Sequence, residues 1–178
     1  MFRQAKALQR EGRYDEAIES FKDCLAQPVK GSELTGQQMF VCTEALVQLM
    51  NSYQSKGEPE TCIATLREVF RTSSALHKYC QRDYYSVLGY ALSRTENMKE
   101  AEETMLKAFT MPLHNATPER YFRDYAYAAA VFYPNPKYQK EVIDWCQEAL
   151  LQAQLCKNTS GKQWVTAMLG SLYKRNGH

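Results

Sequence analysis

The chain has 178 residues, enough for one ordinary domain with a buried core. Its 22 Lys and Arg nearly balance 20 Asp and Glu, so a net charge of +2 gives no strong field to recruit nucleic acid or an anionic membrane. No apolar run approaches the ~20 residues of a membrane helix, and the first residues open directly into an amphipathic pattern, so we expect neither a membrane span nor a signal peptide.

A spaced pattern of small and apolar residues returns four times along the chain. Each copy has the form residue-x3-residue-x2-residue, and the copies begin at Ala17, Cys62, Ala101 and Val142. Twelve residues before each copy stands another small or apolar residue, and a fifth such position follows near the end of the chain: Ala5, Met50, Gly89, Ala130 and Gly170. These five positions are 45, 39, 41 and 40 residues apart, a period that predicts stacked supersecondary units.

Helical spacing of apolar residues predicts about nine helices, arranged as pairs. In chain order we expect them at residues 2–11, 14–26, 34–55, 58–75, 80–94, 98–111, 119–132, 138–156 and 163–175. Gly12 suits a left-handed helix end, and 56–59 forms the equivalent turn in the second pair. Loops are expected at 27–32, 112–118, 133–136 and 158–161, because Pro, Gly, Asn and Ser gather there.

The residues of this pattern resemble those of the tetratricopeptide repeat. Residues 12–21 match the turn and second helix of that family's motif, while Leu88-Gly89 and Leu169-Gly170-x2-Tyr173 match its first helix. The units are longer than the usual 34 residues, as in long-repeat variants of bacterial regulatory proteins. The resemblance implies an all-α, right-handed superhelical solenoid. We expect a single domain over 1–178, with units at about 1–30, 34–77, 80–113 and 118–157 and a half unit at 160–178.

What the resemblance implies about function is binding of a protein or peptide on a concave face lined by the first helices. The side chains expected on this groove are polar or aromatic: Asn51, Gln54, Tyr90, Arg94, Tyr127, Lys174 and Arg175. Some family members clamp the C-terminal carboxylate of chaperones with basic groove residues. The matching positions here carry Val47, Asn51, Asp83 and Val87, which argues against that ligand. A solvated face without a ligand remains the alternative.

No other chemistry has a clear signal in the sequence. The six cysteines (24, 42, 62, 80, 146 and 156) form no C-x-x-C pair, so we expect free, inert thiols, a cytoplasmic location and no metal site. No Ser or Cys lies in a recognisable nucleophile motif and no Gly-rich phosphate loop is present, so we expect neither an enzyme nor a cofactor. Asp83 and Asp124 oppose a single-stranded nucleic-acid groove, despite the many aromatic residues nearby.

Two functional interpretations therefore stay open. The first is a peptide-binding module forming the sensory or regulatory part of a longer bacterial signal-transduction protein, such as a sensor histidine kinase. The second is a structural scaffold that self-associates through its repeat edges. Helix 163–175 carries enough apolar residues for two faces, so we also expect the array to continue in a longer parent chain.

Overall fold

A computed structural model of the chain describes residues 1–27 and 34–177. Over these residues the protein is all-α, with ten α-helices, one short 3₁₀ helix and no strand. The chain forms two compact units, residues 1–114 and 115–178, and the boundary falls in the segment 112–118 where the sequence predicts a loop. Nearly all of the predicted loop 27–32 lies outside the described residues.

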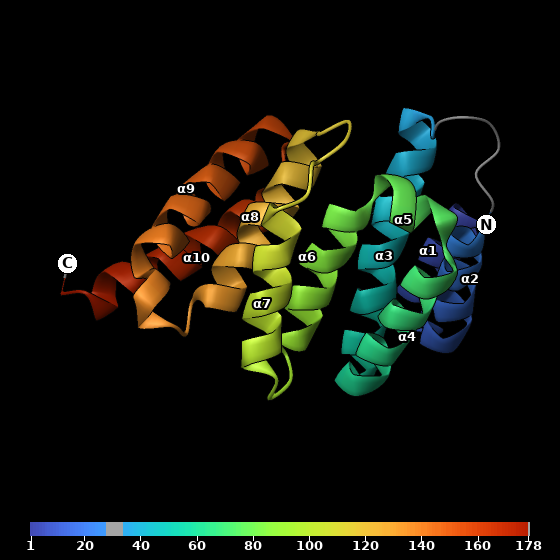
Figure 1. Ribbon diagram of the computed structural model, residues 1–178, viewed down its shortest axis with the longest axis horizontal. Helices are drawn as coiled ribbons and strands as arrows, with labels where there is room; N and C mark the ends of the chain where they lie inside the picture. Colours follow the sequence, from blue (N-terminus) through green and yellow to red (C-terminus); the bar gives the residue numbers. More distant parts are fainter. Residues whose placement is uncertain (28–33, 178) are drawn as a thin grey trace. The chain divides into compact units, whose positions relative to one another are not determined.

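Three helix pairs build the first unit (Figure 1). They are α1 (Phe2–Arg10) with α2 (Tyr14–Ala26), α3 (Gly36–Lys56) with α4 (Pro59–Thr72), and α6 (Gln81–Leu92) with α7 (Met98–Phe109), and the short α5 (Ser74–Tyr79) lies between the second and third pairs. Helix α3 packs against both α1 and α6, so the pairs stack in chain order. This is the predicted arrangement of repeats.

Identical backbone turns close the first helices of the first two pairs. Gly12 and Gly57 both adopt positive φ, 75° and 71°. After each helix, the glycine N–H and the next N–H donate to carbonyls three and five residues back: Gln9 and Leu8 in the first pair, Gln54 and Tyr53 in the second. This bond pattern satisfies carbonyls that the helix end would otherwise leave unpaired. The left-handed turn predicted at Gly12 is confirmed, and Gly57 repeats it.

The repeated sequence pattern forms the core. The first member of every copy is at most 1% exposed: Ala17, Cys62, Ala101 and Val142. The middle members Phe21, Leu66, Met105 and Cys146 are fully buried. Burying a large apolar side chain stabilises the fold by roughly 1.5–3 kcal/mol. The pattern therefore marks the positions where successive helices pack against one another.

The helix predicted over 58–75 is wrong at its C-terminal end. Helix α4 stops at Thr72, because the buried Ser73 leaves the helical conformation and its hydroxyl donates to the carbonyl of Leu25 at 2.8 Å. The same hydroxyl accepts from the Leu76 N–H at 3.4 Å and caps α5, an additional helix. Serine competes in this way with helical hydrogen bonds, and the result links the end of α2 to the α4–α5 junction.

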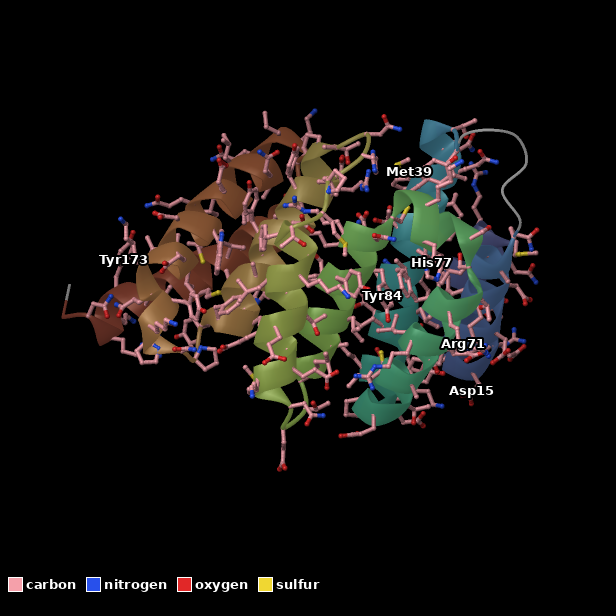
Figure 2. The ribbon with its side chains drawn as sticks, in the orientation of Figure 1. Asp15, Met39, Arg71, His77, Tyr84 and Tyr173 are labelled. Atoms are coloured by element: carbon pink, nitrogen blue, oxygen red, sulfur yellow. The ribbon has the colours of Figure 1, made fainter. Side chains whose placement is uncertain are left out.

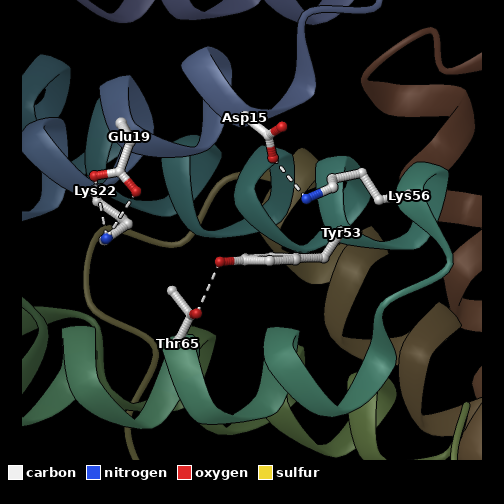
Figure 3. A network of polar contacts seen from close by, with 6 residues as sticks. All are labelled: Asp15, Glu19, Lys22, Tyr53, Lys56 and Thr65. Atoms are coloured by element: carbon white, nitrogen blue, oxygen red, sulfur yellow. Dashed lines mark hydrogen bonds and ion pairs between the residues drawn. The ribbon is translucent and has the colours of Figure 1, made fainter.

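Polar contacts tie the first two pairs together at the turn side (Figure 3). Lys56, at the end of α3, forms an ion pair with Asp15 of α2 at 2.6 Å and another with Glu58 at 3.0 Å. The hydroxyls of Tyr53 and Thr65 lie 2.9 Å apart and join α3 to α4. The Lys56–Asp15 ion pair joins the first two helix pairs, whereas the contacts of Glu58 and Thr65 hold the second pair together.

The second unit holds α8 (Pro118–Phe132), the 3₁₀ helix η1 (Pro136–Tyr138), α9 (Gln139–Leu155) and α10 (Thr159–Arg175). Ala130 was expected at the close helix approach, but it is partly exposed, whereas Ala126, Ala128 and Ala129 are fully buried. Six residues separate α8 from α9, against three between α1 and α2. The buried small residues of α8 are Ala126, Ala128 and Ala129 instead of Ala130.

Helix α10 differs from its prediction in two ways. It begins at Thr159 instead of 163, because Asn158 caps it by accepting from the Gly161 N–H at 2.9 Å. The expected second apolar face is also wrong. Val165, Leu169 and Leu172 share one buried face, and Tyr173, 39% exposed, is the one large hydrophobic residue of α10 that is exposed (Figure 2). The remaining exposed positions of this helix are polar or small: Thr159, Ser160, Lys162, Gln163, Thr166, Ala167, Gly170, Ser171, Lys174 and Arg175.

Candidate peptide-binding site

In the first unit, three of the predicted groove residues lie on α3 and α6, and the fourth, Arg94, lies in the turn just after α6. Asn51 and Tyr90 are half-buried, while Gln54 and Arg94 are exposed. Asn51 and Tyr90 are 39 residues apart, the same spacing as Met50 and Gly89, so they occupy equivalent positions on two first helices that contact each other. A side-chain amide and a phenol therefore stand at one level of adjacent repeats.

The environment of Tyr90 suits a neutral hydrogen-bonding group. Burial raises the pKa of its phenol, and the nearby positive charge of Arg94 partly opposes that shift. The hydroxyl therefore stays protonated at neutral pH, with a guanidinium close by. Tyrosine offers a large contact area with a polar tip, and an amide such as Asn51 can both donate to and accept from a peptide backbone.

The three groove residues predicted in the second unit have different surroundings. Tyr127 is 8% exposed, and its ring meets Trp164 of α10 edge-on at 6.5 Å. The guanidinium of Arg175 donates to the Tyr133 carbonyl at 3.2 Å and stacks on the Tyr133 ring at 4.7 Å. Lys174 is exposed. Tyr127 and Arg175 thus have structural contacts inside the second unit, which leave less of each side chain for a ligand.

Three of the positions compared with the chaperone clamp are buried. Val47, Asp83 and Val87 are 8%, 5% and 0% exposed. Neither valine can supply the positive charge that a terminal carboxylate requires, and the buried aspartate has the wrong sign. Their burial agrees with the sequence argument against a chaperone-tail ligand.

A stack of aromatic rings crosses α4, α5 and α6. Phe70 lies 3.9 Å from Tyr84 and 4.2 Å from His77, ring centre to ring centre, and Tyr85 joins the stack 5.0 Å from Tyr84. Burial raises the pKa of Tyr84 to about 12. The Lys107 ammonium covers the outer ring of the stack at 4.3 Å from Tyr85. These aromatics act as packing between repeats.

The cysteines are free, and four of them are buried: Cys42, Cys62, Cys80 and Cys146. Burial raises the pKa values of the Cys62 and Cys146 thiols to about 12, which disfavours the reactive thiolate. Cys24 is only partly buried, although the repeat pattern placed it in the interior. In the described part of the chain, no three His, Cys, Asp or Glu side chains gather as a metal site would require.

Sequence reasoning missed the basic side of α1. Arg3, Lys6 and Arg10 lie on this helix, and Lys6 is 45 residues before Asn51, the spacing of Ala5 and Met50. Lys6 therefore corresponds to Asn51 and Tyr90 in the repeat. The signal was visible as basic residues at i, i+3 and i+7, but the predicted groove residues began with the second unit and included none from the first.

The stacked pairs and the equivalent positions on their first helices define a helical-repeat protein. Tetratricopeptide-repeat models match residues 1–28, which include α1 and α2, and residues 83–114, which include most of α6 and all of α7. The chain therefore carries tetratricopeptide repeats in these two segments. No curated protein and no solved structure matches it. None of the helices in the described segments combines the length and apolarity needed to cross a bilayer.

Proposed function

We propose that this chain is a peptide-binding module whose site is the face formed by the first helices of the first unit. Tetratricopeptide repeats generally mediate protein–protein interactions. The observation that carries the proposal is the pairing of Asn51 and Tyr90 at equivalent, partly accessible positions of α3 and α6. Gln54 and Arg94 extend the same face toward the ends of these helices.

Selection from a random phage-displayed peptide library tests this proposal. Labelled copies of the selected peptides are then measured by fluorescence anisotropy against wild type, Asn51→Ala and Tyr90→Ala. Truncating a central interface tyrosine often weakens binding by ~30-fold, so we expect at least a tenfold loss with Tyr90→Ala. Lys99→Ala is the control, because this lysine is 92% exposed on α7, a second helix.

Selected peptides that bind both variants as tightly as wild type would contradict the proposed site. The scaffold interpretation predicts a different result: concentration-dependent oligomers in light scattering, with no peptide selected. Under the peptide-binding proposal, Asn51→Ala leaves the oligomeric state unchanged.

We further propose that the module is the regulatory or sensory part of a larger bacterial signal-transduction protein in the cytoplasm, for example a sensor histidine kinase. Support comes from the 39–45-residue units, which resemble long-repeat regulatory variants, and from the six free thiols. The coding sequence after residue 178 tests the first part: a kinase or other output domain is expected, and an immediate stop codon would contradict it. Alkylation tests the cytoplasmic location: when protein taken from cells is unfolded without reductant, all six thiols are expected to react.

A further inference from the structure

The first helix carries an unusually uniform charge. Helix α1 contains Arg3, Lys6 and Arg10 and no acidic residue. At 3.6 residues per turn, positions i, i+3 and i+7 fall within about 60° of one another around the helix axis, so the three cations share one face. Ala5, on another side of the helix, is fully buried. The helix thus packs through one face and presents a basic stripe on another.

The carboxylates nearby do not neutralise this stripe. In the described residues, Arg3, Lys6 and Arg10 make no ion pair, whereas basic residues that follow α1 do: Arg13 with Glu16, Lys22 with Glu19, and Lys56 with Asp15. The Lys6 ammonium lies over the Phe2 ring, 5.9 Å from the ring centre. Three acids of α2, Asp15, Glu16 and Glu19, are thus engaged with other cations. Arg3 and Arg10 are exposed, so the positive charge of α1 faces solvent.

The repeat positions place the stripe beside the proposed peptide site. Lys6 corresponds to Asn51 and Tyr90, and Arg10 corresponds to Ser55 and Arg94. The Gln9 amide holds α1 against α3 by donating to the Gln48 carbonyl at 3.1 Å and to the Ser52 hydroxyl at 3.0 Å. Arg94 is also exposed and makes no ion pair with a described carboxylate. Cations therefore lie on α1 and in the turn after α6, and the helix α3 between them carries amides and hydroxyls.

We infer that the partner of this face is an acidic peptide segment whose Asp and Glu side chains meet the α1 stripe. This inference rests on the proposed function, since it names the chemistry of the peptide for the same site. Guanidinium and ammonium groups select carboxylates, and the polar groups of α3 suit the peptide backbone. Recognition uses side-chain carboxylates along the segment and does not require a free C-terminus, because the stripe runs along a helix instead of converging on one point.

Charge-removal variants test the inference in the intact chain. The peptides selected from the random library are the probes, each made with a free and with an amidated C-terminus. The triple variant Arg3→Gln, Lys6→Gln, Arg10→Gln removes the stripe. A matched triple variant, Lys22→Gln, Arg71→Gln, Lys99→Gln, removes the same net charge from exposed positions of the second helices. Circular dichroism confirms that both variants remain helical.

The expected result is enrichment of acidic peptides that bind the stripe variant roughly tenfold more weakly, since three exposed ion pairs are each worth only a few-fold. Binding should also weaken between 50 and 500 mM salt, and amidation should have no effect. The matched variant should bind as wild type does.

The other outcomes separate the inference from the proposed function. Neutral or basic peptides that depend on Tyr90 but not on the stripe would overturn the inference and leave the proposed function standing. Loss of binding on amidation would also overturn it, in favour of a terminal-carboxylate clamp. If no peptide is selected but a 20-nucleotide single-stranded RNA or anionic vesicles bind through the stripe, both proposals fail.

Discussion

Gly89 and Gly170 offer a direct test of how closely the repeats pack. Both occupy the same position of the repeat, twelve residues upstream of the pattern in the third unit and at the matching position of the last helix. A Cβ built on Gly89 would lie 3.2 Å from the Met105 backbone nitrogen and 3.3 Å from the Ala101 carbonyl oxygen. A Cβ on Gly170 would meet nothing within 4 Å. The same substitution therefore probes a packed and an open helix face.

The expected energies follow from two opposing effects. Replacing a helical glycine with alanine stabilises the helix by about 1 kcal/mol at either position. At Gly89 the added methyl also presses on backbone atoms of α7, which cannot rotate away, and overpacking of this kind costs about 1–3 kcal/mol. We expect Gly170→Ala to raise the free energy of unfolding by about 0.5–1 kcal/mol. Gly89→Ala should leave it unchanged or lower it by up to about 2 kcal/mol.

Urea unfolding followed by circular dichroism measures both variants against wild type. In thermal scans, each 1 kcal/mol corresponds to a shift of about 2–4 °C for a chain of this size. If Gly89→Ala stabilises the protein as much as Gly170→Ala does, then α6 and α7 do not approach closely at Gly89, and the packing argument for the repeat fails.

Three further outcomes are expected. Ser73→Ala should cost about 1–3 kcal/mol in urea unfolding, because the buried Leu25 carbonyl loses its hydroxyl donor; a change below 0.5 kcal/mol would contradict this. Ala101→Trp, at a fully buried position, should cost at least about 1–3 kcal/mol, and no change would refute the repeat positions. The thiols of Cys62 and Cys146 should react with a thiol reagent slowly in the native protein and fully after unfolding. Because burial raises their pKa values from about 9 to about 12, the free energy of unfolding should fall as pH rises through that range. Unfolding midpoints that do not change with pH in that range would refute this reasoning.

The parts of the fold that could be predicted are those in which sequence spacing reflects packing. Ala17, Cys62, Ala101 and Val142 recur because each lies where two helices meet, so their spacing was enough to find the helices. Ser73 could not be predicted to end a helix, since its effect depends on the Leu25 carbonyl, 48 residues away. The prediction for Ala130 failed for a related reason: its burial depends on how α8 packs against its neighbours, which a fixed interval of twelve residues does not report.

The candidate site was predictable only in part. Asn51 and Tyr90 could be placed because repeats carry their register along the chain. The contact of Tyr127 with Trp164 joins α8 to α10 and depends on how those two helices pack, which periodicity does not report. The role of the basic residues of α1 could not be predicted from their positions alone. It depends on which carboxylates pair with other cations, and the ion pairs of Glu16 and Asp15 are visible only in the structure.

The Lys56 link has a mechanical consequence. The Lys56 side chain, 23% exposed, joins the turn of the second repeat to the first turn of α2, whereas the proposed peptide site lies along the first helices. The link resists flexing that would separate the first two pairs at that end. Dissolved salt screens this ion pair and weakens its resistance to such flexing. The stiffness of the first unit thus depends partly on ionic strength, so a peptide bound at the proposed site would meet a somewhat more flexible first unit at high salt than at low salt.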